Sequence, residues 1–230
     1  RKAEIRKHIM RNGRGLTKST PSYNDDVQDL FPELIIEYNI KSLPVFGAVK
    51  TEPWSDDYWP IYKGVLGARF SELEFQETYI WRQAKRFVDE NPIKNYIEQD
   101  KVNNLSPSEK FDLLLNSQDS ELPLTKAMWA EGERYLINSD EVEKWMGICH
   151  GWAPASFMVE RPKHSVTVKS ADNIDIKFYP SDIKALTSLL WAKGEFQNHF
   201  VGGRCNSKDP EESDNGRITR QECRDNNPAT

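Results

Sequence analysis

Apolar residues recur at helical intervals through the middle of the chain. Between Ser71 and Asn91 they lie seven, four and three positions apart, and Ser71 with Glu74 matches a capping box. This pattern predicts one helix from Ser71 to Asn91. The next helix is expected to begin at Ser106, because a cap residue, a first-turn proline and Glu109 three positions later occur together.

Helical spacing continues and then gives way to alternation. Helices are predicted over residues 123–135 and 140–146, the second ending at Gly147. Two alternating runs follow, and the polar stretch 170–173 between them suits a hairpin turn. A last helix is expected over residues 181–193, so the order of elements predicts an α+β fold. The alternating residues are Val166, Val168, Ile174, Ile176 and Phe178.

The two ends of the chain differ from this middle part. Residues 1–25 are basic and polar and contain glycine and proline, which predicts a mobile arm. Residues 27–68 are broken by prolines, and we expect an irregular wrap around the core. Its aromatic residues would serve as packing anchors. These anchors are Trp54, Tyr58, Trp59 and Tyr62.

Composition excludes several classes of protein. An aromatic share of 11% and a hydrophobic share of 37% argue against disorder and for a soluble globular chain. The net charge of −5 argues against nonspecific nucleic-acid binding. No apolar run is long enough to predict a membrane span.

Cys149 is the main candidate for chemistry. It lies between Gly147 and an alanine-rich apolar run that is expected to open a helix. A helix N-terminus favours the thiolate form of a cysteine and offers N–H groups to an oxyanion. The helix begins either at Cys149, with Pro154 inside it as a kink, or nearer Trp152. The alternative interpretation of the cysteine is a buried structural thiol.

Acyl transfer also needs a general base and a second oxyanion donor. His150 directly follows the thiol, so its side chain points about 100° away and is expected to line the cleft instead. His164, with Asp182 eighteen positions later, is the base that we assign. His199, with Asp214 further on, is the other arrangement. The four histidines are His8, His150, His164 and His199, and His8 lies in the predicted arm.

The oxyanion hole would combine the backbone N–H of Cys149 with a side-chain donor. Trp59 is one candidate, and Gln83 is another unless it is a solvated helix residue. Together with His150 and Trp152, Trp59 is predicted to line the substrate-binding cleft.

The three cysteines give an odd count, which allows one pair and one free thiol. Cys205 and Cys223 enclose a polar loop, so the simplest pairing is a disulfide between them that leaves Cys149 free. This holds for a secreted protein, whereas in a cytosolic protein all three would be thiols.

Four longer motifs resemble the secreted transglutaminase elicitor family of oomycete plant pathogens. The motifs span residues 59–70, 148–156, 179–186 and 200–206. The resemblance implies an extracellular, calcium-dependent protein-glutamine γ-glutamyltransferase with Cys149 as nucleophile, acting on proteins with accessible glutamine and lysine. The resemblance also implies a glycoprotein. The sequence has one N-glycosylation sequon, at Asn104, and the proline that follows it makes it a poor acceptor.

The resemblance also sets expectations for architecture. It implies a helical N-terminal lobe followed by a papain-like arrangement, in which the nucleophile helix packs on antiparallel strands. Residues 26–230 would be the N-terminal part of the catalytic domain. The true base, its carboxylate and the elicitor peptide are expected beyond Thr230. The C-terminal remainder of the precursor would then be a binding partner of this chain and complete its site.

Calcium is implied only by the resemblance. The best candidate ligands are Glu211, Asp214 and Glu222, in a stretch spaced like an EF-hand loop. The alternative is an acidic hairpin turn at residues 214–216. Two other functions also stay open: a papain-like cysteine protease, and a non-catalytic recognition module with an inert cysteine.

Overall fold

The computed structural model describes residue 33 and residues 35–115, 122–194, 210–220 and 223. The predicted arm over residues 1–25 lies outside these residues. Contacts divide the chain into two compact units, Val49–Gly194 and Arg1–Ala48 with Glu195–Thr230. The predicted domain running from residue 26 to residue 230 stays a prediction.

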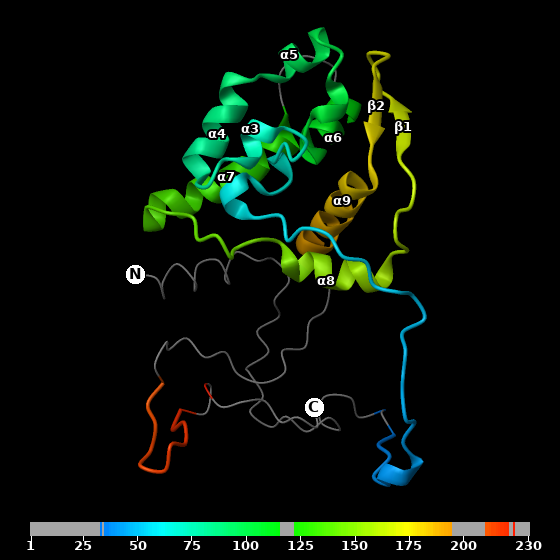
Figure 1. Cartoon of the computed structure of the whole chain (residues 1–230), viewed down its shortest axis with the longest axis vertical. Helices are drawn as coiled ribbons and strands as arrows, with labels where there is room; N and C mark the ends of the chain where they lie inside the picture. Colours follow the sequence, from blue (N-terminus) through cyan, green and yellow to red (C-terminus); the bar gives the residue numbers. More distant parts are fainter. Residues whose placement is uncertain (1–32, 34, 116–121, 195–209, 221–222, 224–230) are drawn as a thin grey trace. The chain divides into compact units, whose positions relative to one another are not determined.

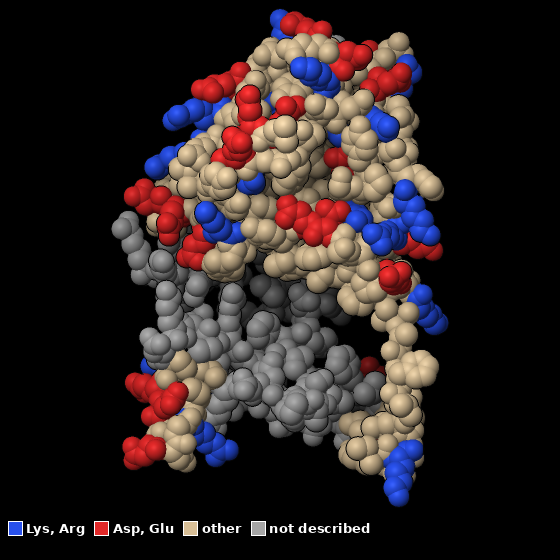
Figure 2. All heavy atoms as spheres, viewed as in Figure 1, with Lys and Arg blue, Asp and Glu red and all other residues tan. Residues whose placement is uncertain are grey.

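The unit Val49–Gly194 contains mainly helix and one small antiparallel sheet, so the α+β prediction is confirmed (Figure 1). Figure 2 shows acidic and basic side chains interspersed over its visible face. The α-helices are α3 (Leu73–Gln76), α4 (Trp81–Glu90), α5 (Ile93–Glu98), α6 (Pro107–Leu115), α7 (Pro123–Ser139), α8 (Cys149–Met158) and α9 (Pro180–Lys193). The 3-10 turns are η2 (Ile61–Lys63), η3 (Val65–Gly67) and η4 (Val102–Asn104), and the strands are β1 (Val166–Lys169) and β2 (Asp175–Phe178).

The predicted hairpin forms between β1 and β2. Its register pairs Val166 with Phe178, and the turn is closed by the Ser170 hydroxyl, which accepts a hydrogen bond from Ile174 N at 3.1 Å. The inner strand β2 buries Ile176 and Phe178, whereas every residue of β1 is exposed. The sheet therefore packs on the core through β2.

The helix predicted to begin at Ser106 is confirmed. At the start of α6, Ser106 N donates to Glu109 Oε2 at 2.9 Å, and Glu109 N donates to the Ser106 hydroxyl at 3.3 Å. The predicted capping box is thus present and buried. Helix α7 runs four residues beyond the predicted end, and α9 ends at Gly194 as expected.

The single helix predicted from Ser71 to Asn91 is wrong. The chain forms two helices, α3 and α4, because the Ser71 hydroxyl donates to Asn104 O at 2.8 Å and does not cap a helix. Two apolar residues that suggested one buried stripe are solvent-exposed: Leu73 by 78% and Ile80 by 51%. Tertiary contacts of this segment therefore override its local pattern.

The short helix predicted over residues 140–146 is also wrong. Asp140 adopts a φ of 65° and ends α7, and the following residues form turns. Gly147 pairs with Pro60 in an isolated antiparallel bridge. A side chain there would meet Tyr58 O at 2.3 Å, so glycine allows the two backbones to approach closely.

Residues 49–68 are more ordered than a loose wrap. Trp54 and Trp59 are each 2% exposed, which confirms their role as packing anchors. Both belong to the core cluster that contains Ile148 and residues of α8 and α9. The turns η2 and η3 lie in the same cluster through Ile61, Val65 and Leu66.

A buried ion pair joins the segment that follows η3 to α6. Arg69 Nη2 lies 2.7 Å from Glu109 Oε1, and both side chains are 1% exposed. The guanidinium also stacks 4.4 Å from the Tyr96 ring and donates to Asn91 O at 2.6 Å. This bidentate, fully hydrogen-bonded geometry is what a buried charge requires.

Helices α8 and α9 pack through a glycine contact. A β-carbon on Gly151 would lie 2.2 Å from Ser188 O and 2.6 Å from the Ala192 side chain. Only a residue without a side chain therefore fits between the two helices. This contact fixes the start of α8, and Cys149 with it, against the last turn of α9.

In the other unit, the described residues include η1 (Ile40–Ser42) and a tight turn. The turn links a bridge between Glu212 and Ile218, with Gly216 at a φ of 75°. Among the helices in the described ranges, none is long and apolar enough to cross a bilayer.

Candidate functional site: a thiol at the start of α8

Cys149 is the first residue of α8, and its thiol is free and exposed. The alternative of a buried structural cysteine is therefore wrong, as is a helix start nearer Trp152. Two contacts hold the residues before the thiol: Ile148 N donates to Tyr58 O at 3.0 Å, and Gly147 bridges Pro60. The thiol is thus presented by a rigid, buried support.

The N-terminus of α8 has no side-chain cap. Within the described part of the chain, the N–H groups of Cys149 and His150 have no hydrogen-bond acceptor. Such orphan donors carry the partial positive charge of the helix end and attract an anion. The site can therefore receive negative charge next to a sulfur atom.

His150 packs its ring towards the end of α9. Burial lowers the pKa of its imidazole, and the charge of Lys193 lowers it further, against a hydrogen bond to the backbone of Ala192 and the charge of Glu131. Lys193 itself pairs with Glu131 at 3.2 Å. A neutral imidazole hydrogen-bonded to α9 suits a residue that lines the cleft.

The two tryptophans predicted to line the cleft are joined to the core by their own contacts. Trp152 donates its indole N–H to Trp54 O at 3.2 Å, and Trp59 is buried in the core. Gln83 is exposed on α4, where its side-chain oxygen accepts from Tyr79 N at 3.0 Å. Gln83 is thus the solvated helix residue that was the alternative to an oxyanion donor.

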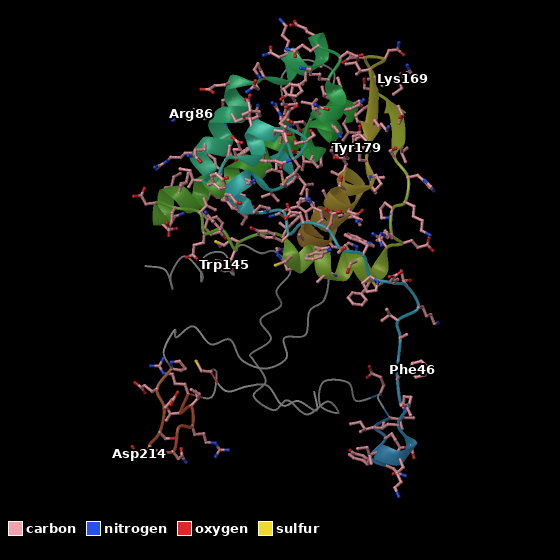
Figure 3. All side chains as sticks on the ribbon, viewed as in Figure 1. Phe46, Arg86, Trp145, Lys169, Tyr179 and Asp214 are labelled. Atoms are coloured by element: carbon pink, nitrogen blue, oxygen red, sulfur yellow. The ribbon has the colours of Figure 1, made fainter. Side chains whose placement is uncertain are left out.

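Sequence reasoning missed an exposed aromatic residue close to the thiol. Trp145 is 62% exposed and lies near the start of α8 (Figure 3). Its indole N–H is hydrogen-bonded to the Glu143 carboxylate. The sequence shows a tryptophan four positions before Cys149, but its exposure could not be read from the sequence.

The assigned base stays a prediction. His164 is exposed on the segment between α8 and β1, and no hydrogen bond joins it to Cys149 in the described residues. Asp182, its expected partner, is buried and accepts from Lys110 Nζ and Tyr179 N, each at 2.7 Å. Two of the other histidines, His8 and His199, lie outside the described residues.

The predicted calcium ligands and disulfide are only partly within the described chain. Glu211 and Asp214 lie on the exposed turn of the other unit, which is closed by a bond from Gly216 N to Ser213 O at 2.8 Å. The third ligand, Glu222, falls outside. No group of three metal-binding side chains occurs among the residues that the structure does describe. The calcium ligands stay a prediction.

The predicted disulfide also stays a prediction. Cys205 falls outside the described residues, although Cys223 is described.

A cavity of about 270 Å³ forms a second feature of this unit. Asp56 and Asp57 lie in its wall. Asp56 pairs with Lys184 at 3.0 Å, and Lys110 pairs with Asp182 at 2.7 Å. The other lining residues are Trp59, Ala68, Phe70, Ser71, Asn103, Leu105, Pro107, Tyr179 and Ser181.

Comparison with known proteins identifies the family. The family model for the transglutaminase elicitor matches residues 26–230. No curated protein and no solved structure matches the chain at a significant level. The chain belongs to the transglutaminase elicitor family.

Proposed function

We propose that this chain carries the nucleophile of a protein-glutamine γ-glutamyltransferase. The observation that carries the proposal is the free, exposed thiol of Cys149 at the uncapped N-terminus of α8, in a chain of this family. Transglutamination needs a thiolate beside donors for an oxyanion, and the unpaired N–H groups of Cys149 and His150 supply such donors.

The proposed reaction has two steps. The Cys149 thiolate attacks the carboxamide carbon of a glutamine, and ammonia leaves with a proton from a general acid, giving a thioester. A lysine amine then attacks the thioester carbonyl and loses a proton, giving an isopeptide bond and the free thiol; water in place of the amine gives glutamate. In both steps, the N–H groups at the start of α8 would hold the tetrahedral oxyanion.

The general base is proposed to come from outside the described residues. His150 is held against α9 by its contact with Ala192, and Asp182 is committed to Lys110. His164 remains the described candidate, since hydrogen bonds in a free enzyme often tighten only with substrate. A papain-like plan, in which a later strand brings a histidine to the thiol, is part of the proposal.

Secretion and calcium dependence belong to the same proposal. The family supports both, and the predicted pair of Cys205 with Cys223 would favour an oxidising, extracellular compartment. Calcium has no assembled ligand set among the described residues, so no reaction step is assigned to it.

The decisive experiment is transfer of dansylated cadaverine to dimethylcasein by the full-length protein, with ammonia release measured in parallel. We expect both signals, and we expect Cys149→Ala to reduce them by about a thousandfold or more because the nucleophile is lost. Asp175→Asn, an exposed change far from α8 in sequence, is the matched control and should leave the rate unchanged.

Each other outcome identifies a different function. Peptide cleavage without ammonia release, lost in Cys149→Ala, would establish a papain-like protease. An elicitor response that persists in Cys149→Ala, with no amine transfer by the unmodified protein, would establish the non-catalytic recognition module. Iodoacetamide labelling of Cys149 tests the exposed thiol directly, and failure to label would contradict the site.

A further inference from the structure

The cavity between the loop at Asp57 and the start of α9 is walled by unequal charges. Three carboxylates line it, at Asp56, Asp57 and Asp182, but only one ammonium group, at Lys110. Lys110 is 2.7 Å from Asp182, and Asp56 is neutralised by Lys184 at 3.0 Å. These two ion pairs leave one lining carboxylate without an ammonium group in a salt bridge.

The remaining carboxylate is Asp57. Among the described residues it forms no salt bridge, and its Oδ1 accepts the backbone N–H of Tyr58 at 2.8 Å. The positive charge of Lys63 acts on Asp57, but its ammonium group donates to Gln76 O at 3.2 Å. Burial raises the pKa of Asp57, and the charge of Asp56 adds to this, against the backbone hydrogen bonds of Tyr58 and Trp59 and the charge of Lys63. A cation beside Asp57 would favour its carboxylate form further.

The rest of the wall is apolar and aromatic. Phe70, Leu105 and Pro107 line the cavity, and Trp59, a residue that is 2% exposed, belongs to the same wall. Tyr179, at the junction of β2 and α9 (Figure 3), already lies 4.8 Å from the Lys110 ammonium group. Aromatic faces beside a carboxylate are the surroundings that bind organic ammonium ions.

We propose that this cavity binds an alkylammonium group, with the charge at Asp57 and the alkyl chain against Phe70, Leu105 and Pro107. A volume of about 270 Å³ has room for a short unbranched amine. The binding is a property separate from the thiol chemistry, so it is measured in full-length Cys149→Ala protein. Loss of the proposed transferase activity would leave it unaffected.

The test is a nuclear magnetic resonance titration of the full-length protein with n-pentylamine. We expect saturable shifts of the Trp59 indole signal, with a Kd of about a millimolar for so small a ligand. Pentan-1-ol and pentanoate have the same chain without the positive charge, and both should bind at least about tenfold more weakly. Equal binding of pentanoate would overturn the proposal.

Three variants locate the charge. Asp57→Asn keeps the acceptor for Tyr58 N and should weaken pentylamine about tenfold. Ser181→Lys, at the exposed rim, adds a cation without entering the core and should weaken it similarly. Asp175→Asn removes an exposed carboxylate that does not line the cavity and should have no effect. Equal affinity of Asp57→Asn and the parent protein would refute the assignment, as would absence of saturable binding.

The alkylammonium group has two possible sources, and two probes distinguish them. Nα-acetyl-lysine methylamide represents a lysine side chain of a protein, and cadaverine represents a free diamine. Tighter binding of the lysine derivative assigns the cavity to a protein ligand, and tighter binding of cadaverine assigns it to a small amine. Either result supports the proposal if Asp57→Asn weakens the probe.

Discussion

The starts of α6 and α8 are built in opposite ways. At α6, Ser106 and Glu109 satisfy each other's backbone donors, and Glu109 also holds the buried Arg69. At α8 no side chain caps the helix, and the thiol of Cys149 is exposed. The comparison shows that one helix end is closed to stabilise the fold, while the other keeps free donors beside a nucleophile.

The largest effect on stability should come from removing the carboxylate that caps α6. Glu109→Ala removes the capping carboxylate and leaves Arg69 charged and buried, so the free energy of unfolding should fall by about 3–5 kcal/mol. Urea denaturation measures the change. Glu74→Ala is the control, because the capping box predicted there does not form; a loss of similar size at Glu74 would show that the comparison fails.

Displacing the start of α8 from α9 should have the next largest effect on stability. Gly151→Ala places a methyl group against Ser188 O and must separate α8 from α9, which should cost about 1–3 kcal/mol. The gain in helix propensity from replacing a glycine, about 1 kcal/mol, is smaller than the upper part of this range. Thermal unfolding compared with Ala153→Leu, an exposed change on the same helix, measures the effect. A stabilised Gly151→Ala protein would contradict the tight packing.

Removing only the hydroxyl of the α6 cap should cost less. Ser106→Ala leaves Glu109 N without its side-chain acceptor and should lower the free energy of unfolding by about 1 kcal/mol. Ser71→Ala provides the comparison, since its hydroxyl bonds Asn104 O at an exposed site. An equal loss in the free energy of unfolding for Ser106→Ala and Ser71→Ala would contradict a stabilising cap at α6.

The smallest effect concerns pH at the open end. Because the pKa of His150 is lowered in the folded state, the unfolded chain binds more protons between the folded and unfolded pKa values. His150 should therefore favour folding less as the pH falls through the ordinary range of histidine, near 6.5. His150→Gln should flatten the fall in melting temperature between about pH 7 and pH 5. An identical pH dependence would refute this account.

Some elements could be read from sequence because their signals are local. The Ser106 cap, the hairpin turn at residues 170–173 and the glycine end of α9 each depend on neighbours a few positions away. The helix over residues 71–91 could not be read correctly, because Ser71 bonds Asn104 O, more than thirty positions further on. Exposure of Leu73 and Ile80 has no local signal either.

The sequence alone determined the α+β class, the helix start at α6 and the presence of a candidate nucleophile at Cys149, because caps, periodicity and residue chemistry are local properties. Tertiary structure decided that the thiol is exposed and that its assigned base is not hydrogen-bonded to it. It also decided that Asp57 lies in a cavity. These outcomes depend on which distant segments meet, and the meeting of Tyr58 with Ile148 is a long-range contact that neither residue encodes by itself.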